Sequence, residues 1–468
     1  MNNYSNIQMK VRIYKHCTTQ FKFLKNILVF FICLFCIMNL NGQTVQTGRN
    51  IQSSNDSLSL DEIIKNVMQN HPSVKEAEEA LNAADAKINI AKAGYLPNID
   101  ATGSFTRIGP PPVISFEGMK FQMAPDNICN TSINYNQSIY DFGRTSRDVR
   151  VQKENKNLAQ ASLEQLKQSM ALLVMNTFFS LVYLQDAIII NNDQLKTLKE
   201  HLDFIVKKKE TGSATEYEVL STQVKISNVE SQKIDLEAYR ITMISLINIL
   251  QGQPDTNNVV VKKELTKDQP QMVPDSLVPY AINNRDEIKI ANEKAKIADL
   301  TYRFIQAQYN PIFEFYASAG WKNGYMQNGH TSDLYIMTAN YSAGIGLTIP
   351  IFNATRTKNN LHLTKSQMQS TDYELEVAKR NITNEVVQAK ANMTASEEKI
   401  KQFELQLSQA KKALSLAEIS YKSGVITNLD LMDATTAVSE SQLSLLKAQI
   451  DNVVNQYKLK VALGEKLY

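Results

Sequence analysis

The sequence predicts a mainly α-helical chain with a small β part, built twice over from one unit. Gly occurs 16 times and Pro 12 times in 468 residues, so turns are scarce and the elements must be long. Neither residue occurs from Arg144 to Thr211 or from Thr215 to Gln251. Shorter stretches alternate apolar and polar residues, which is typical of strands. The same order of patterns then occurs again in the second half.

The helices come first. We expect a helix to begin near Leu58, to break at Pro72 and to continue from Ser73 to Ala93, a stretch rich in Ala, Glu and Lys. Gly94 and Pro97 end it. The stretch from Arg144 to Thr211 that follows would form a helix of roughly 100 Å.

Glycine turns divide the long helices into hairpins. Apolar residues advance by three and four positions from Ile400 to Tyr421 and again from Leu429 to Tyr457, with Gly424 between them. This 3.5-residue period is the seam of a coiled coil, and the short break folds the two helices back as an antiparallel pair. Gly212 divides the first long pair in the same way.

Two β-hairpins interrupt the helices. The first joins strands at Ile99–Phe105 and Ile133–Ile139 through a Pro-rich loop, Gly109–Asn130, and the second pairs Ile312–Trp321 with Tyr341–Phe352. Strands of about ten residues with aromatic ends suit a tilted crossing of a bilayer. A soluble sandwich is the alternative that the strands alone leave open.

The two halves correspond residue by residue. Tyr95 and Tyr309 are 214 positions apart (309 − 95), while Gly212 and Gly424 are 212 apart (424 − 212). The difference of two residues falls between the strands, where a loop absorbs it. The expected domains are a signal peptide at 1–42, a mobile linker at 43–57, a first structural repeat at 58–253, a linker at 254–275 and a second structural repeat at 276–468.

The N-terminus predicts export. Five basic and no acidic residues precede an apolar run, Ile27–Leu40, which is shorter than the ~20 residues of a membrane-spanning helix and typical of a signal peptide. Cys33 and Cys36 lack the preceding small residues of a lipoprotein site. Once the signal peptide is removed, Cys129 is the only cysteine left, so no intrachain disulfide is expected. The formal charge of +3 becomes about −2 without those five basic residues (+3 − 5), which disfavours nucleic acid as a partner.

Four strands cannot close a membrane barrel, because the smallest use about eight and open edges are not tolerated in lipid. If the strands cross a membrane, several chains must share the barrel. The helices are far longer than the ~30 Å apolar layer, so they must project into water.

These residues resemble the TolC-like outer-membrane efflux proteins over Leu58 to Tyr468. The most specific stretch is Tyr421–Ser441, with its GVITNLDLMDATT run, supported by Tyr140–Arg144 (YDFGR). The resemblance implies a homotrimer with a 12-stranded transmembrane β-barrel, four strands per chain, continued by a long periplasmic α-helical coiled-coil tunnel. It also implies a periplasmic membrane-fusion adaptor, an inner-membrane pump of RND or ABC type acting through that adaptor, and outer-membrane lipid as partners.

The hairpin tips are the candidate site. The resemblance implies that the adaptor contacts the turns and that side chains just beyond them line a pore aperture. The tip candidates are Gly212, Ser213, Gly424 and Val425, and the aperture candidates are Asp430, Asp433, Tyr421 and Glu218.

Local structure offers another explanation for part of this set. Thr followed three residues later by an acid forms a capping box, which accounts for Glu218 and Asp430. Capping does not account for Asp433, and plain packing would explain Tyr421. Ile426 stands where well-known members of the family carry a basic gating residue, so we expect other contacts to close the tip.

The function predicted is an exit duct in the outer membrane of a Gram-negative bacterium, serving tripartite efflux or type I secretion. The five histidines show no triad or metal-ligand spacing, so neither an enzyme nor a cofactor or metal is expected. The alternative is a periplasmic coiled-coil adaptor or scaffold without a channel; adaptors of that kind usually carry a single helical hairpin.

Overall fold

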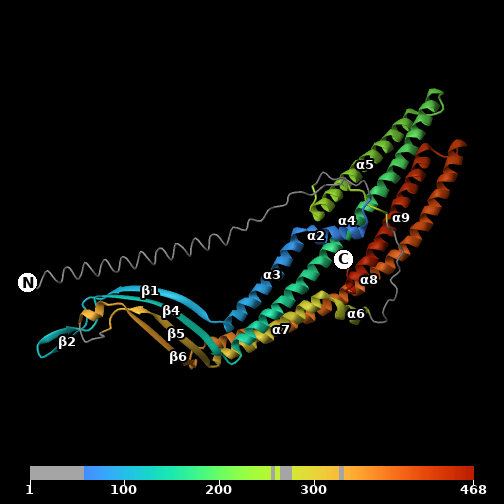
Figure 1. Cartoon of the computed structure of the whole chain (residues 1–468). Helices are drawn as coiled ribbons and strands as arrows, with labels where there is room; N and C mark the ends of the chain where they lie inside the picture. Colours follow the sequence, from blue (N-terminus) through green and yellow to red (C-terminus); the bar gives the residue numbers. More distant parts are fainter. Residues whose placement is uncertain (1–56, 255–258, 264–276, 326–330) are drawn as a thin grey trace, which may run out of the picture. The chain divides into compact units, whose positions relative to one another are not determined.

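The computed structural model describes residues 57–254, 259–263, 277–325 and 331–468 (Figure 1). The expected signal peptide, nearly all of the linker at 43–57 and most of the linker at 254–275 lie outside these residues.

The helices are α2 (Leu60–Asn70), α3 (Pro72–Lys92), α4 (Arg144–Glu210), α5 (Glu216–Gln251), α6 (Leu277–Asn284), α7 (Asp286–Gln306), α8 (Arg356–Lys422) and α9 (Asn428–Ala462), with short 3₁₀ turns η1 (Ala93–Tyr95), η2 (Ala307–Tyr309) and η3 (Thr331–Tyr335).

The predicted break at Pro72 is confirmed. His71 adopts an extended backbone between α2 and α3, and its Nδ1 accepts a hydrogen bond from Ser73 N at 3.2 Å. Pro72 is tolerated because it occupies the first turn of α3, where no backbone donor is needed. A capping box between Ser59 and Glu62 begins α2.

The long helices pack in two pairs, α4 with α5 and α8 with α9, and α4 also packs along α9 (Figure 1). Helices α4 and α8 have 67 residues each, which corresponds to about 100 Å. The seam predicted on α8 is confirmed, since Tyr421 is buried and the other seam positions are half-buried, namely Ile400, Phe403, Leu407, Ala410, Leu414 and Ala417. On α9 the prediction was wrong at Leu429, which is 44% exposed, because Asn428 takes the inward position at 2%.

The strands β1 (Asn98–Arg107), β4 (Asn127–Tyr140), β5 (Ile312–Lys322) and β6 (Thr338–Thr348) form one antiparallel sheet in the order β1-β4-β5-β6. The two predicted hairpins therefore join through β4 and β5, and β1 and β6 are the edges.

Two features of the strands differ from expectation. The loop expected at 109–130 contains a separate two-stranded ribbon, β2 (Val113–Phe116) with β3 (Met119–Gln122). Strand β6 ends at Thr348 rather than Phe352, because Pro350 has no amide hydrogen to continue the ladder.

The pairing register separates the four-stranded sheet into a polar and an apolar face. Directly paired residues share a face, and Ile99 follows this rule through Tyr135 and Ala317 to Ala343. That face is apolar, with Ile133, Phe315, Ala319, Tyr341, Ile345 and Leu347. The opposite face carries Asp100, Thr102, Ser132, Asn134, Ser318 and Ser342.

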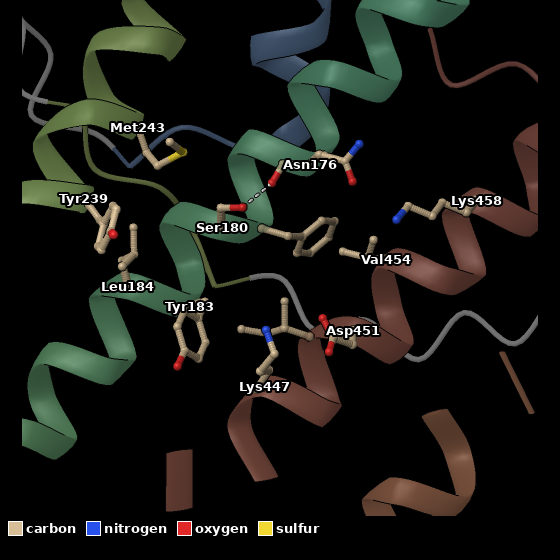
Figure 2. Close-up of a pocket in the computed structure, with 12 residues that line it drawn as sticks. Asn176, Ser180, Tyr183, Leu184, Tyr239, Met243, Lys447, Asp451, Val454 and Lys458 are labelled. Atoms are coloured by element: carbon tan, nitrogen blue, oxygen red, sulfur yellow. Dashed lines mark hydrogen bonds between the residues drawn. The ribbon is translucent and has the colours of Figure 1, made fainter. Parts of the chain in front are cut away.

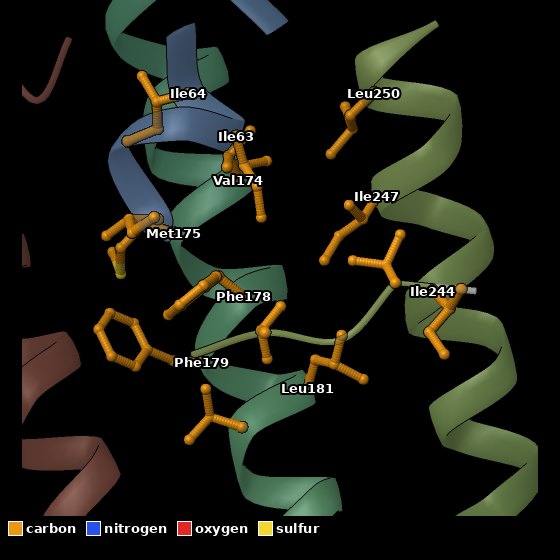
Figure 3. Packing of buried hydrophobic residues seen from close by; sticks show 14 of the residues in the cluster. Ile63, Ile64, Val174, Met175, Phe178, Phe179, Leu181, Ile244, Ile247 and Leu250 are labelled. Atoms are coloured by element: carbon orange, nitrogen blue, oxygen red, sulfur yellow. The ribbon is translucent and has the colours of Figure 1, made fainter. Parts of the chain in front are cut away.

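The main hydrophobic core lies where α2 and α5 pack against the middle of α4 (Figure 3). Ile63, Phe178 and Ile247 are fully buried there. Of the helices described, α4 is the one long and apolar enough to cross a membrane by composition, and half of its apolar stretch is buried inside the fold. This burial accounts for the apolar stretch as core.

Part of the segment expected to be a linker belongs to this core. Val259 and Val261 are buried in it, and Leu58 N donates to Val260 O at 2.9 Å while Lys262 N donates to Leu58 O at 3.0 Å. The linker prediction was therefore wrong for this part, since a short parallel bridge joins it to Leu58.

Candidate functional site

The two hairpin tips share one turn geometry. Gly212 and Gly424 have φ of 74° and 73°, in the left-handed region that glycine adopts without strain. Ser213 N donates to Lys208 O at 2.8 Å, and Val425 N donates to Ser420 O at 2.9 Å. These bonds form the Schellman closure of a helix end. The Val425 side chain is 76% exposed, so the tip presents it to solvent.

Glu218 and Asp430 both act as helix caps. Glu218 Oε2 accepts from Thr215 N at 2.7 Å, and Asp430 Oδ2 accepts from Thr427 N at 2.9 Å. The threonine hydroxyls accept in return from the amides of Glu218 and Asp430 at 3.3 Å each. Hydrogen bonds from the Thr427 side chain and backbone lower the pKa of Asp430, which keeps this exposed carboxylate charged.

Asp433 makes a different contact. Its Oδ1 lies 2.9 Å from Lys225 Nζ, so an ion pair joins α9 to α5. No local sequence pattern indicates Lys225 as its partner, because Lys225 lies 208 residues away in the chain. Asp433 remains more than half exposed, and it can still contribute its charge to the surface.

Tyr421 is buried, at the end of α8. Its ring lies 5.7 Å from the His201 ring, and Lys208 Nζ lies 4.9 Å from its centroid. Burial and, secondarily, the Glu218 charge raise the pKa of the Tyr421 hydroxyl. This residue therefore holds helices together and stays neutral at physiological pH.

Asn428 is the functional candidate that sequence reasoning missed. Its Nδ2 donates to Thr222 Oγ1 at 3.1 Å and to Glu218 O at 3.4 Å. Its Oδ1 lies 2.6 Å from His201 Nε2, and we assign the ring proton to Nε2 because the amide oxygen can only accept. One buried amide thus connects α9 to α4 and α5. The sequence pattern at this turn indicates a capping box between Thr427 and Asp430. Asn428 takes no part in that pattern, so the sequence does not indicate its role.

We use the term tip junction for the contacts between the two hairpins near their tips. It consists of His201, Thr222, Lys225, Tyr421, Asn428 and Asp433. The structure brings Tyr421 and Asp433 of the predicted set into this junction and adds the main chain of Glu218. The turn residues Gly212, Ser213, Gly424 and Val425 lie outside these contacts. What the junction can do is hold one hairpin in register against the other.

A groove of about 380 Å³ lies farther along the helices, between α4, α5 and α9 (Figure 2). Two of the residues that line it are Lys447 and Tyr183, and Lys447 Nζ lies 5.8 Å from the centroid of the Tyr183 ring. Burial and the Asp451 charge raise the pKa of Tyr183. None of the predicted site residues lines this groove. Among the described residues, no group of three or more His, Cys, Asp or Glu side chains could hold a metal ion.

Comparisons with known proteins agree with this architecture. Nodulation protein T of Rhizobium leguminosarum bv. viciae is 23% identical over 411 residues, covering 86% of this chain and 81% of that protein. Outer membrane protein TolC of Escherichia coli K12 is 21% identical, covering 84% and 80%.

Solved structures share the fold. The outer-membrane channel OprN superposes with a TM-score of 0.75 at 16% identity, over 90% of this chain and 99% of that one. The MtrE outer membrane channel of Neisseria gonorrhoeae, solved in its open state, gives 0.72 at 19% identity, over 92% and 98%.

The family model described as outer membrane efflux protein matches at residues 63–250 and 277–465, once in each half. Because these two matches span most of the sequence, the chain belongs to the outer membrane efflux protein family.

Proposed function

We propose that three copies of this chain form a passive exit duct in the outer membrane, which conducts substrates from a pump and its adaptor to the outside. The observation that carries the proposal is the two-faced sheet with open edges β1 and β6. The family is one of outer-membrane efflux proteins, and the chain is a transport protein rather than an enzyme.

The sheet supports a shared barrel. Unpaired strand edges cannot stay in lipid, because every backbone group there must be satisfied. Strands β1 and β6 have 10 and 11 residues, and they run in opposite directions in the sheet. Strand β1 of one copy can therefore pair with β6 of the next, and three copies of four strands close a ring of twelve. The apolar face then meets lipid.

The polar face suits a water-filled lumen. Asn134 is its centre: Nδ2 donates to Asp100 Oδ2 at 2.9 Å, and Oδ1 accepts from Ser318 Oγ at 2.9 Å. Thr102 Oγ1 and Ser132 Oγ lie 2.9 Å apart on the same face. These hydrogen bonds join polar side chains of β1, β4 and β5 to one another. The face is therefore a continuous polar surface.

The long helices support a tunnel. Helix α8 exposes large apolar side chains along its length, among them Val377, Val387, Leu405, Leu416 and Ile419 at 54–61%. A row of this kind on one helix indicates an unfilled packing face. Helices of neighbouring copies would cover it and continue the barrel as a closed wall in the periplasm.

The tips would meet the partners. We infer that the turns at Gly212–Ser213 and Gly424–Val425 contact a periplasmic adaptor and, through it, an inner-membrane pump of RND or ABC type. Asp430 and Asp433 of three copies would then surround the aperture, a ring that attracts cations. We further propose that the two structural repeats span residues 58–253 and 276–468.

Relatives point to two kinds of cargo. One is named an alkaline protease secretion protein of Pseudomonas aeruginosa, 23% identical over 71% of this chain and 69% of that protein. Another is named a toluene efflux pump outer membrane protein of Pseudomonas putida, 24% identical over 87% and 83%. By analogy, this duct would pass small toxic molecules or polypeptides.

Single-channel conductance of the detergent-extracted protein in a planar bilayer tests the proposal. We expect a small, cation-selective conductance that grows and loses selectivity in the Asp430→Ala, Asp433→Ala double variant. Glu404→Ala, an exposed acid elsewhere on α8, should leave both unchanged. Absence of conductance from protein shown to be inserted would favour the periplasmic adaptor or scaffold instead.

A further inference from the structure

The β2–β3 ribbon is a built element at the end of the sheet away from the long helices. Its register pairs Ile114 with Phe121. Glu117 and Gly118 at its turn both have positive φ, 48° and 81°, which is the geometry of the tight hairpin turn that matches strand twist. Strand β1 runs from α3 toward the ribbon. In the proposed barrel the ribbon would therefore lie at the end that faces out of the cell, opposite the periplasmic helices.

The base of the ribbon is pinned to the sheet. Met123 N donates to Pro112 O at 2.8 Å, and Ile108 N donates to Asp126 O at 2.8 Å. Gln122 Nε2 donates to Asp126 Oδ1 at 2.8 Å and reaches Tyr335 Oη at 3.3 Å. These bonds fix the ribbon against β4 and against the turn before β6.

The ribbon nevertheless leaves its apolar side chains uncovered. Val113, Ile114, Phe121 and Met123 are 41–55% exposed. An isolated two-stranded hairpin is marginally stable in water, and packing against another element is what usually stabilises it. A second uncovered pair, Ile336 at 56% and Met337 at 44%, lies directly before β6.

The two apolar groups belong to different connections at one end of the sheet, the ribbon to the connection between β1 and β4, and Ile336 with Met337 to the connection before β6. The ribbon begins six residues after β1 ends (113 − 107), and Met337 immediately precedes β6. The ends concerned, Arg107 and Thr338, lie at the same end of the sheet, since Arg107 pairs with Asn127 and Thr338 with Lys322. Within one copy the ribbon side chains do not cover Ile336 and Met337, although Gln122 of the ribbon contacts Tyr335. Among the residues that the structure describes, neither group is covered by the other.

We propose that the ribbon of each copy packs on the adjacent copy, with Ile114 and Phe121 against that copy's Ile336 and Met337. This inference rests on the proposed shared barrel, because pairing of β1 with the neighbour's β6 brings the two groups to one rim. The ribbon then ties neighbouring copies together outside the membrane and covers the seam between them.

Disulfide cross-linking in intact membranes tests the contact. In a Cys129→Ser background, Ile114→Cys with Met337→Cys should give oxidised species of dimer and trimer size. The matched control is Ser115→Cys with Met337→Cys, because Ser115 lies on the opposite face of the ribbon from Ile114; its yield of linked copies should be several-fold lower.

The shared barrel is tested separately in the same background. Thr102→Cys, on edge strand β1, is combined in turn with Asn340→Cys, Ser342→Cys and Gly344→Cys, on edge strand β6. One outcome is that one of these edge pairs links neighbouring copies while Ile114→Cys with Met337→Cys gives no link, or only links within one chain. That result would overturn the ribbon contact and leave the shared barrel standing. Failure of all three edge pairs would instead overturn the shared barrel.

A second readout does not depend on linking geometry. Ile114→Cys alone, in assembled protein, should be labelled by a membrane-impermeant maleimide several-fold more slowly than Ser115→Cys. Equal rates would show that the ribbon stands free in solvent and would overturn the contact.

Discussion

Asn428→Ala should loosen the tip junction. The substitution removes a fully engaged amide and leaves Thr222 Oγ1, whose residue is 0% exposed, without its donor. His201 Nε2 is only part-buried, so water can replace that partner. Loss of one buried partner costs about 1–3 kcal/mol. We infer that the tip junction is intact in a closed tip and broken in an open one, so that a central value of about 2 kcal/mol changes the ratio of open to closed tips about 30-fold.

Single-channel recording measures this ratio directly. The variant should spend correspondingly more time in the larger conductance state, and His201→Ala should show a smaller effect of the same sign. In the double variant the effects should not add, because both substitutions remove the same hydrogen bond. Asn384→Ala is the matched control, since Asn384 is exposed on α8. Open times equal to wild type in Asn428→Ala, from inserted protein, would refute the role of the junction.

Two further outcomes follow from the core and the cap. Phe178→Ala, at a fully buried position, should lower the free energy of unfolding by about 3–5 kcal/mol, measured by denaturant titration, whereas Phe204→Ala at a 44% exposed position should cost much less; equal losses would contradict the core assignment. Because hydrogen bonds from Thr427 hold the pKa of Asp430 below that of an ordinary aspartate, its contribution to the start of α9 is fully present above the ordinary aspartate pKa and is lost as the pH falls through the lowered pKa. The protection of residues 427–433 against hydrogen exchange, measured relative to the intrinsic exchange rate at each pH, should therefore fall in acid for wild type but show no such step for Asp430→Asn.

Local pattern was sufficient for most of the architecture. Helix periods, glycine turns and capping boxes act over three to seven residues, so the sequence determined α4, α5, α8 and α9 and the turns between them. Alternation of apolar residues likewise determined the four strands of the main sheet.

Boundaries and hidden elements depended on contacts across the chain. The ribbon at 113–122 was missed because the prolines on either side of it indicate a loop. Residues 259–263 read as a linker, yet Val259 and Val261 find a core supplied by distant helices. The prediction placed Leu429 on the seam because it is apolar. In the structure Asn428 takes the inward position, because its side-chain amide hydrogen-bonds to three polar groups there.

For the candidate site, the sequence determined which residues lie at the tips, and the tertiary structure decided what each one touches. The caps at Glu218 and Asp430 were readable because both partners lie three residues apart. The pairing of Asp433 with Lys225 and of Asn428 with His201 was not, because each joins residues more than 200 positions apart. Such contacts exist only once the two hairpins lie side by side, and no local periodicity encodes them.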